Sequence, residues 1–93
     1  MIYIEDNDIR RGGEKIGWYD ENRIYNRDGK KLGYFIDQRI YNEEGDKIGY
    51  LQDNYLFADE GGRRARIDDV CEEVKGGVLS DVGRAAIYLF LGN

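Results

Sequence analysis

Short runs of apolar residues alternate with short polar turns along the first two-thirds of the chain, and the pattern recurs with a period of about 16 residues. Residues 3–17, 18–33, 34–49 and 50–65 align. Each segment has an opening aromatic residue, then an acid, an amide and an aliphatic residue, and a glycine near its end. The stretches between the turns are rich in Ile, Tyr, Phe and Leu and lack helical spacing. The pattern predicts a meander of about eight short strands, written as four β-hairpin units.

Two kinds of turn alternate in the repeat. Acid–amide pairs tolerate left-handed backbone conformations, and between β-forming residues they suit a two-residue hairpin loop. In the second turn a glycine supplies the positive φ that a tight loop needs. The acid–amide pairs are Asp6-Asn7, Glu21-Asn22, Asp37-Gln38 and Asp53-Asn54, and the turn glycines are Gly13, Gly29, Gly45 and Gly61.

Each of the first three units closes with a lysine, an aliphatic residue and a glycine, whereas the fourth departs from this ending. The recurring glycine either bends the strand or leaves room for a neighbouring side chain. Strict alternation along residues 31–36 puts Lys31, Gly33 and Phe35 on one face and the residues between them on the other. Apolar residues then occupy both faces, so another element must cover the second face.

The C-terminal part of the chain is a candidate for that cover. Residues 67–74 are predicted to form a short helical turn, which two consecutive glycines end. Ser80 or Asp81 can cap a second helix that runs to Leu91. Residues 86–91 are apolar on all sides, so this helix needs either a deep socket in the β unit or a partner subunit.

The chain therefore divides into a β-hairpin repeat unit, residues 1–66, and a C-terminal helical segment, residues 67–93, that packs on this unit or on a partner. Leaving one face of the apolar helix in water would forfeit several kcal/mol in a domain this small. We therefore expect a homo-oligomer, most simply a dimer. Its interface would consist of Ile87, Tyr88, Leu89, Phe90 and Leu91.

Residues 17–33 read Gly-Trp-Tyr-Asp-Glu-Asn-Arg-Ile-Tyr-Asn-Arg-Asp-Gly-Lys-Lys-Leu-Gly, and copies of this unit cover residues 3–65. The unit resembles the repeat of the four-fold beta flower family, small bacterial proteins. The resemblance implies a mainly β fold with a C-terminal α-helix, in which four hairpin repeats of about 16 residues surround a pseudo-fourfold axis. It implies no activity and no catalytic residue.

Composition and charge mainly exclude functions. The 93 residues suit one small domain, and a net charge of −5 argues against a nucleic-acid or anionic-membrane partner. The basic cluster Arg63, Arg64 and Arg66 is expected to be a solvated loop. Cys71 is the single cysteine, which fits a reducing compartment, and we expect it to be buried. No signal peptide or apolar run of bilayer length is visible, so a cytoplasmic location is expected.

The chain contains no histidine, which removes the commonest general base and the usual nucleophile and zinc arrangements. No phosphate-binding loop, dinucleotide fingerprint or EF-hand loop is present. We therefore expect no enzymatic activity, no cofactor and no metal ion.

The repeat itself offers one candidate constellation. Around an axis, the four turn acids could converge to bind Ca²⁺ or to hold two acids for glycoside hydrolysis, although turn chemistry alone accounts for them. The opening aromatic residues are expected in the core, but exposed rings would form a platform for sugars or a peptide. The candidate ligand-binding residues are Asp6, Glu21, Asp37, Asp53, Trp18, Tyr34 and Tyr50.

Two classes of function stay open at this point. The preferred one is a non-enzymatic interaction or assembly module, which self-associates or binds another protein. The alternative is a small-ligand or carbohydrate-binding module that uses the aromatic and carboxylate positions. Buried aromatic residues favour the first, and a solvent-facing aromatic pocket ringed by carboxylates favours the second.

Overall fold

The computed structural model describes residues 1–92, which form one ten-stranded sheet and two helices. The prediction of a mainly β fold with a C-terminal helix is confirmed. Beyond the eight predicted strands, the chain adds β9 and a two-residue β10. In chain order the elements are β1 (Ile2–Glu5), β2 (Asp8–Arg11), β3 (Glu14–Asp20), β4 (Arg23–Asn26), β5 (Lys31–Ile36), β6 (Arg39–Asn42), β7 (Lys47–Gln52), β8 (Tyr55–Ala58), β9 (Gly62–Arg66), α1 (Ile67–Glu73), β10 (Val74–Lys75) and α2 (Asp81–Leu91).

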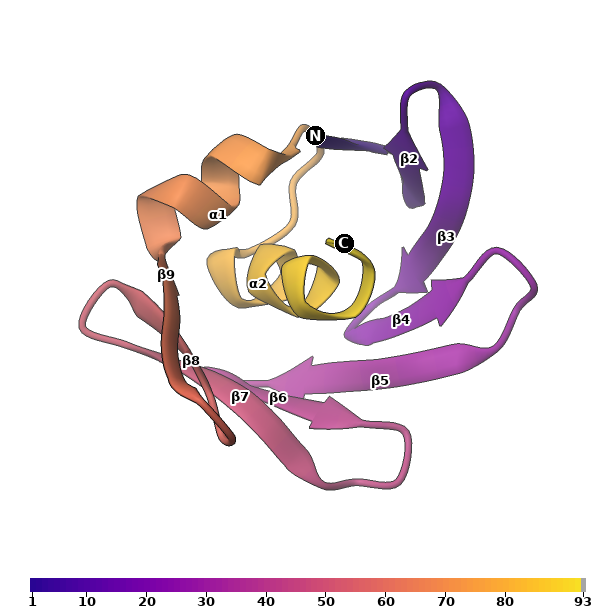
Figure 1. The fold of residues 1–93 in the computed structure, drawn as a ribbon. Coiled ribbons are helices and arrows are strands. Elements are labelled where there is room, and N and C mark those ends of the chain that lie inside the picture. Colours follow the sequence, from indigo (N-terminus) through magenta and orange to yellow (C-terminus); the bar gives the residue numbers. More distant parts are fainter. Residues whose placement is uncertain (93) are drawn as a thin grey trace.

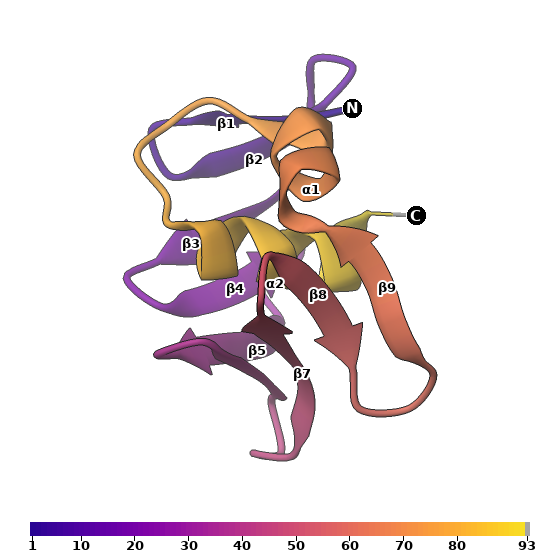
Figure 2. The same ribbon diagram turned by 90° about the vertical axis from the view of Figure 1, so that its left-hand side faces the viewer.

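The sheet is a meander that curls around α2. Its strands lie in the order β10-β1-β2-β3-β4-β5-β6-β7-β8-β9, so successive strands from β1 to β9 are neighbours. These pairs are antiparallel, whereas β10 pairs with β1 in parallel. The hairpins surround α2 (Figure 1 and Figure 2), and α1 connects β9 and β10, which are the two edge strands of the sheet. The helix therefore fills the space that the hairpins enclose.

The acid–amide pairs form the predicted hairpin turns. Each of the four acids takes a left-handed backbone conformation with φ between 53° and 55°. The carbonyl of each amide residue accepts a hydrogen bond from a backbone N–H that follows in the chain, so the turns also tie one hairpin to the next. The donors are the N–H groups of Tyr19, Phe35, Leu51 and Ile67, at N···O distances of 2.8–3.0 Å.

The glycine turns are also confirmed, and in the central units an asparagine side chain closes them. Asn26 Oδ1 accepts hydrogen bonds from the backbone N–H groups of Asp28 and Lys30, at 2.9 and 3.0 Å. Gly29, inside this turn, has a φ of 87°. Asn42 makes the same two contacts in the next unit. Such Asx turns stabilise a tight loop from within the repeat itself.

A β-bulge interrupts the pairing of successive hairpins at the same place in every unit. Across β4 and β5, Tyr25 pairs with Lys31, and Leu32 is the extra residue. Lys31 therefore lies on the outer face with Tyr34, and its Nζ is 5.0 Å from the centroid of that ring. Leu32 packs against the core beside Gly33. The prediction of strict alternation was wrong for Lys31 and Leu32, because the extra residue shifts the pleat by one position.

The core lies between the inner face of the sheet and α2. The aliphatic residue of each unit is fully buried, and opposite it stands the closing glycine or, in the last unit, an alanine. These pairs are Ile9–Gly17, Ile24–Gly33, Ile40–Gly49 and Leu56–Ala65.

The last turn of α2 packs into the places that the glycines leave free. A Cβ atom at Gly33 would lie 2.4 Å from Cζ of Phe90 and 2.2 Å from the carbonyl oxygen of Tyr41. Leu89 and Leu91 lie in the same way against the glycines of the neighbouring units. The apolar helix thus has a socket within its own chain, which is one of the two solutions that its sequence allows.

Polar contacts hold both ends of α2. Ser80 Oγ accepts a hydrogen bond from the Gly83 N–H at 3.2 Å, as predicted for a capping residue. At the other end the guanidinium of Arg11, from β2, donates to the carbonyl of Leu91, where a cation also complements the helix dipole. Neither helix within residues 1–92 is long and apolar enough to cross a membrane.

Arg84 anchors the loop that precedes α2. Its guanidinium donates hydrogen bonds to the carbonyls of Val74, Gly77 and Leu79, at 3.0, 3.4 and 3.1 Å. One side chain on α2 thereby satisfies one backbone carbonyl of β10 and two of the loop that follows it.

The basic cluster of Arg63, Arg64 and Arg66 lies in β9, an edge strand, and not in the solvated loop that the sequence favoured. That prediction was wrong because the fourth unit loses the lysine–aliphatic–glycine signature while it keeps the cross-strand pairing with β8. All three side chains are exposed.

Candidate interaction surface

Aromatic and basic side chains form a continuous row on the outer face of the sheet. In three successive hairpins two aromatic rings stack across a strand pair, with centroids 5.1–5.4 Å apart. A lysine ammonium lies over the first ring of each pair, 4.7–5.0 Å from its centroid. We call this row the outer belt. It consists of Lys15, Trp18, Tyr25, Lys31, Tyr34, Tyr41, Lys47, Tyr50 and Phe57.

The bulges build the belt. Each lysine precedes an opening aromatic residue by three positions. Strict alternation along a strand would place two residues at this spacing on opposite faces. The extra residue of the bulge returns both to the same face, and Tyr25 of one hairpin then pairs with Lys31 of the next. Stacked rings contribute about 0.5–1.5 kcal/mol per pair and exposed cation–π contacts about 0.5–1 kcal/mol, so these contacts favour the observed arrangement of the belt side chains.

Three of the four opening aromatic residues belong to this belt. Trp18, Tyr34 and Tyr50 are half-buried on the outer face and lie outside the hydrophobic core. The expectation that they pack in the core was wrong, because the residue after each of them, such as Tyr19, turns inward instead. Tyr3, the opening residue of the first unit, is 52% exposed.

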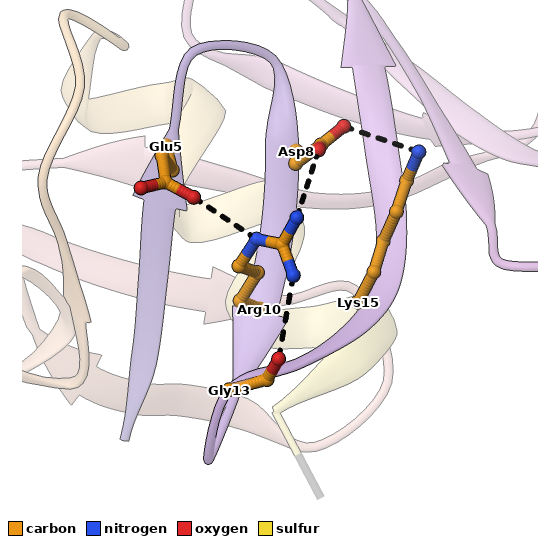
Figure 3. A network of polar contacts seen from close by, with 5 residues as sticks. All are labelled: Glu5, Asp8, Arg10, Gly13 and Lys15. Carbon is orange, nitrogen blue, oxygen red and sulfur yellow. Dashed lines mark hydrogen bonds and ion pairs between the residues drawn. The ribbon is translucent and has the colours of Figure 1, made fainter.

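A network of ion pairs lies at the N-terminal end of the belt, as Figure 3 shows. Arg10 stands where the later units have the second aromatic ring. Its Nε lies 3.1 Å from Oε1 of Glu5, and its Nη2 lies 3.3 Å from Oδ2 of Asp8. Nη1 donates to the carbonyl of Gly13 at 3.3 Å, and Lys15 Nζ lies 3.1 Å from Oδ1 of Asp8. The positive charges at this end are therefore paired within the chain.

At the C-terminal end of the belt, arginine side chains follow the lysines and rings. In the central units an arginine stands opposite the opening aromatic residue of the next unit, as Arg39 stands opposite Tyr50. In the final strand pair the aromatic residue and the arginine have exchanged strands. Tyr55 on β8 takes the place of the arginine, and Arg66 on β9 takes the place of the opening aromatic residue. The guanidinium carbon of Arg63 lies 4.6 Å from the centroid of the Tyr55 ring.

The four turn acids do not form one site. Asp6, Glu21, Asp37 and Asp53 are exposed, each at its own hairpin turn. Within residues 1–92, no three acidic, histidine or cysteine side chains lie close enough to hold a metal ion. The space that the hairpins surround contains α2 (Figure 1), while the four acids are exposed at separate turns.

Two neighbouring hollows bring some of the predicted residues together. Asp37 and Tyr50 line a hollow of about 350 Å³. Asp53 lines another, of about 400 Å³, together with Ser80 and Asp81 at the start of α2. The remaining predicted residues line neither of them. The two hollows share Gln38, Leu51 and Gln52.

The residues predicted for an oligomer interface lie against their own sheet. Ile87 is fully buried, and Tyr88, Leu89, Phe90 and Leu91 are partly buried and pack on the core. This burial within one chain weakens the energetic argument for a partner helix. Self-association itself is not tested by the structure of one chain and stays a prediction. Sedimentation equilibrium at tens of micromolar protein tests it, since a strictly 10.8 kDa species would contradict it.

Cys71 is half-buried on α1, with its Sγ 3.6 Å from Oδ1 of Asp81. Burial, and then the negative charge of Asp81, raise the pKa of the Cys71 thiol. The thiol therefore stays protonated at neutral pH, which disfavours nucleophilic chemistry.

Sequence reasoning identified the opening rings but missed the rest of the belt. A signal was present, because a lysine precedes each opening aromatic residue by three positions in three units. The second ring of each stack likewise follows the buried aliphatic residue directly, as Tyr25 follows Ile24. Both spacings acquire their meaning only once the bulges are known.

Comparison with known proteins finds one family. The family described as 4-fold beta flower protein matches residues 10–78, from within β2 to the loop before α2. No curated protein and no solved structure matches the chain.

Proposed function

We propose that this chain, which belongs to the 4-fold beta flower family, is a non-enzymatic interaction module that binds a protein partner through the outer belt. The observation that carries the proposal is the recurrence of one lysine–aromatic–aromatic stack in three consecutive hairpins. Packing around α2 accounts for the inner face. The belt lies outside that core and still repeats the same chemistry.

The belt presents the residues in which protein interfaces are enriched. Tyrosine, tryptophan and phenylalanine supply large contact areas, and they dominate the binding energy of many interfaces. Rings already held by stacking lose little conformational freedom when a partner binds. The lysines between them add electrostatic complementarity to acidic groups.

A polypeptide suits the belt better than a sugar ring does. A sugar stacks on an open aromatic face, whereas one face of each ring in the belt lies against its stacked partner. Ammonium groups also lie over the rings of Trp18, Tyr34 and Tyr50. The rings also present edges and, in the tyrosines, hydroxyl groups, and these suit the side chains and backbone of another protein.

Site-specific photocrosslinking in the cells that contain the protein tests the proposal. Benzoylphenylalanine in place of Tyr34 is expected to give adducts of a few discrete masses. These adducts are expected to disappear when Lys31→Glu and Lys47→Glu reverse the charge of the belt. The same crosslinker in place of Glu72, exposed on α1, is the control. The proposal fails if position 34 gives no adduct or the same adducts as position 72.

A small-ligand or carbohydrate module is the second candidate, and the hollow beside Tyr50 supports it. This hollow combines one ring with the carboxylate of Asp37 and the amides of Gln38 and Gln52, groups that hydrogen-bond to sugar hydroxyls. Calorimetric titration with glucose and N-acetylglucosamine tests it. Binding that is lost in Asp37→Asn but kept in Glu21→Gln, the equivalent acid of another turn, would support this candidate. An absence of heat at tens of millimolar sugar would contradict it.

A further inference from the structure

The fourth unit departs furthest from the repeat at the end of the outer belt. The earlier units have a lysine, an aliphatic residue, a glycine and an aromatic residue at positions that the fourth unit fills with Arg63, Arg64, Ala65 and Arg66. These residues lie on β9, which pairs only with β8 among the described residues and forms one edge of the sheet (Figure 2). We call Arg63, Arg64 and Arg66 the arginine edge.

Two of these arginines share the outer face with an aromatic ring. Arg66 is the cross-strand partner of Tyr55, and the guanidinium of Arg63 lies over the same ring. A hollow of about 230 Å³ is lined by these residues together with Arg64 and Asp69. Stacking on Tyr55 restricts the Arg63 side chain, so its outward donors are positioned before any ligand arrives.

Within residues 1–92, neither packing against the core nor ion pairing accounts for the arginine edge. None of the three arginines forms an ion pair within residues 1–92, although the chain has 19 acidic and 14 basic side chains. Arg64 also replaces an aliphatic residue that packs against the core in the other units, as Ile48 does. The fourth unit thus exchanges an apolar contact for an exposed charge.

Unpaired guanidinium groups on one strand fit an anionic ligand, and the planar fork of arginine binds a carboxylate through two hydrogen bonds. The surroundings restrict the class of anion. Asp59, Glu60, Asp68 and Asp69 flank the strand, and the net charge is −5. This field repels a polyanion such as nucleic acid, whereas a peptide with a few spaced carboxylates experiences it much less.

We infer that the arginine edge binds an acidic segment of a protein partner, whose carboxylates bind Arg63 and Arg66 beside the Tyr55 ring. The inference rests on the proposed function, because it names the chemistry of the partner that the outer belt binds. A second copy of the chain is a poor occupant, since pairing two β9 edges would bring arginines against arginines.

Fluorescence anisotropy with the purified protein tests the inference. The probe is a labelled peptide with glutamate at alternate positions, and a single-stranded oligouridylate of similar charge is the second probe. Arg63→Gln with Arg66→Gln is expected to weaken peptide binding about tenfold or more. Replacing the same two residues by lysine keeps the charge but removes the forks, and an intermediate loss of about threefold is expected.

The matched control removes two other exposed positive charges, with Arg27→Gln and Lys30→Gln in the turn between β4 and β5, and is expected to change the affinity less than about twofold. Equal losses in the two glutamine variants would overturn the inference, because the effect would then be that of net charge. If the labelled peptide does not bind at millimolar protein concentration, or if the oligouridylate binds more tightly than the peptide, the inference is overturned as well. Crosslinking at Tyr34 without peptide binding would leave the proposed function standing and remove this inference alone.

Discussion

On the inner face of the sheet, the aliphatic position of every unit holds a fully buried residue, whereas the outer face repeats its lysine and stacked rings in three hairpins and departs from them at both ends. Arg10 replaces a ring at one end of the outer belt, and Tyr55 and Arg66 exchange their types at the other. The difference shows which constraint acts where. The space around α2 dictates the inner residues, while the outer face requires only compatible cross-strand pairs and is free to carry a binding function.

The largest effect is expected where a side chain is forced into the inner face. Gly33→Val should lower the free energy of unfolding by more than about 3 kcal/mol, because its Cβ overlaps both the Phe90 ring and the Tyr41 carbonyl. Urea unfolding followed by circular dichroism measures it. Tyr34→Val, the next residue and on the outer face, is the control, and an equal loss in both variants would contradict the comparison of the two faces.

Removing volume from the inner face should cost almost as much. Ile40→Ala is expected to destabilise by about 3 kcal/mol, because Ile40 is fully buried and the cavity can relax only in part. Ile36, on β5, is 49% exposed, and Ile36→Ala should stay within about 0.5 kcal/mol of the parent. The two isoleucine-to-alanine variants thus compare the loss of unfolding free energy on the two faces. Similar losses would show that the inner face is not the core.

Stacked rings on the outer face should contribute less. Tyr34→Ala is expected to destabilise by about 1 kcal/mol, through loss of its stacking on Tyr41 at 5.1 Å. A double-mutant cycle with Tyr41→Ala isolates the pair, and it should give a coupling of about 0.5–1 kcal/mol. A coupling of zero would mean that the two rings are merely adjacent.

The smallest effect concerns the lysines of the belt. Lys31→Met keeps the aliphatic stem and removes the charge over the Tyr34 ring, so a loss of about 0.5 kcal/mol is expected. Lys30→Met, one residue earlier and exposed in the turn, removes the same charge without an aromatic contact. Equal unfolding free energies for the two variants would show that the cation–π contact adds nothing to stability, and the belt lysines would then act only in binding.

Turns and most strands could be predicted because their signals act over a few residues. Asp37-Gln38 forms its hairpin turn from its own backbone preferences, and Gly45 supplies a positive φ without help from distant contacts. The bulge at Leu32 could not be predicted in the same way, because an extra residue is visible only in the register of two paired strands. The face assignment of Lys31 failed for that reason.

Less of the candidate site could be predicted, because its parts meet only across strands. The ring of carboxylates was a reasonable hypothesis for an open axis, but whether α2 fills that space depends on contacts such as Phe90 against Gly33, far apart in the chain. The strand that contains Arg63 was missed because pairing with β8, not a local pattern, makes it a strand. Its positive charge could be read from the sequence, but the lack of ion pairs within residues 1–92 and the position beside Tyr55 could not.

The position of α2 near the end of the chain affects how the protein folds during its synthesis. A ribosome completes all the strands of the sheet before it begins the helix that lines their inner face. Nascent hairpins can form, since their turns and pairings are local, but Ile9, Ile24 and Ile40 have no α2 to cover them during that interval. Until residues 81–91 emerge, the growing chain exposes a strip of isoleucines, a surface that chaperones bind and that promotes aggregation.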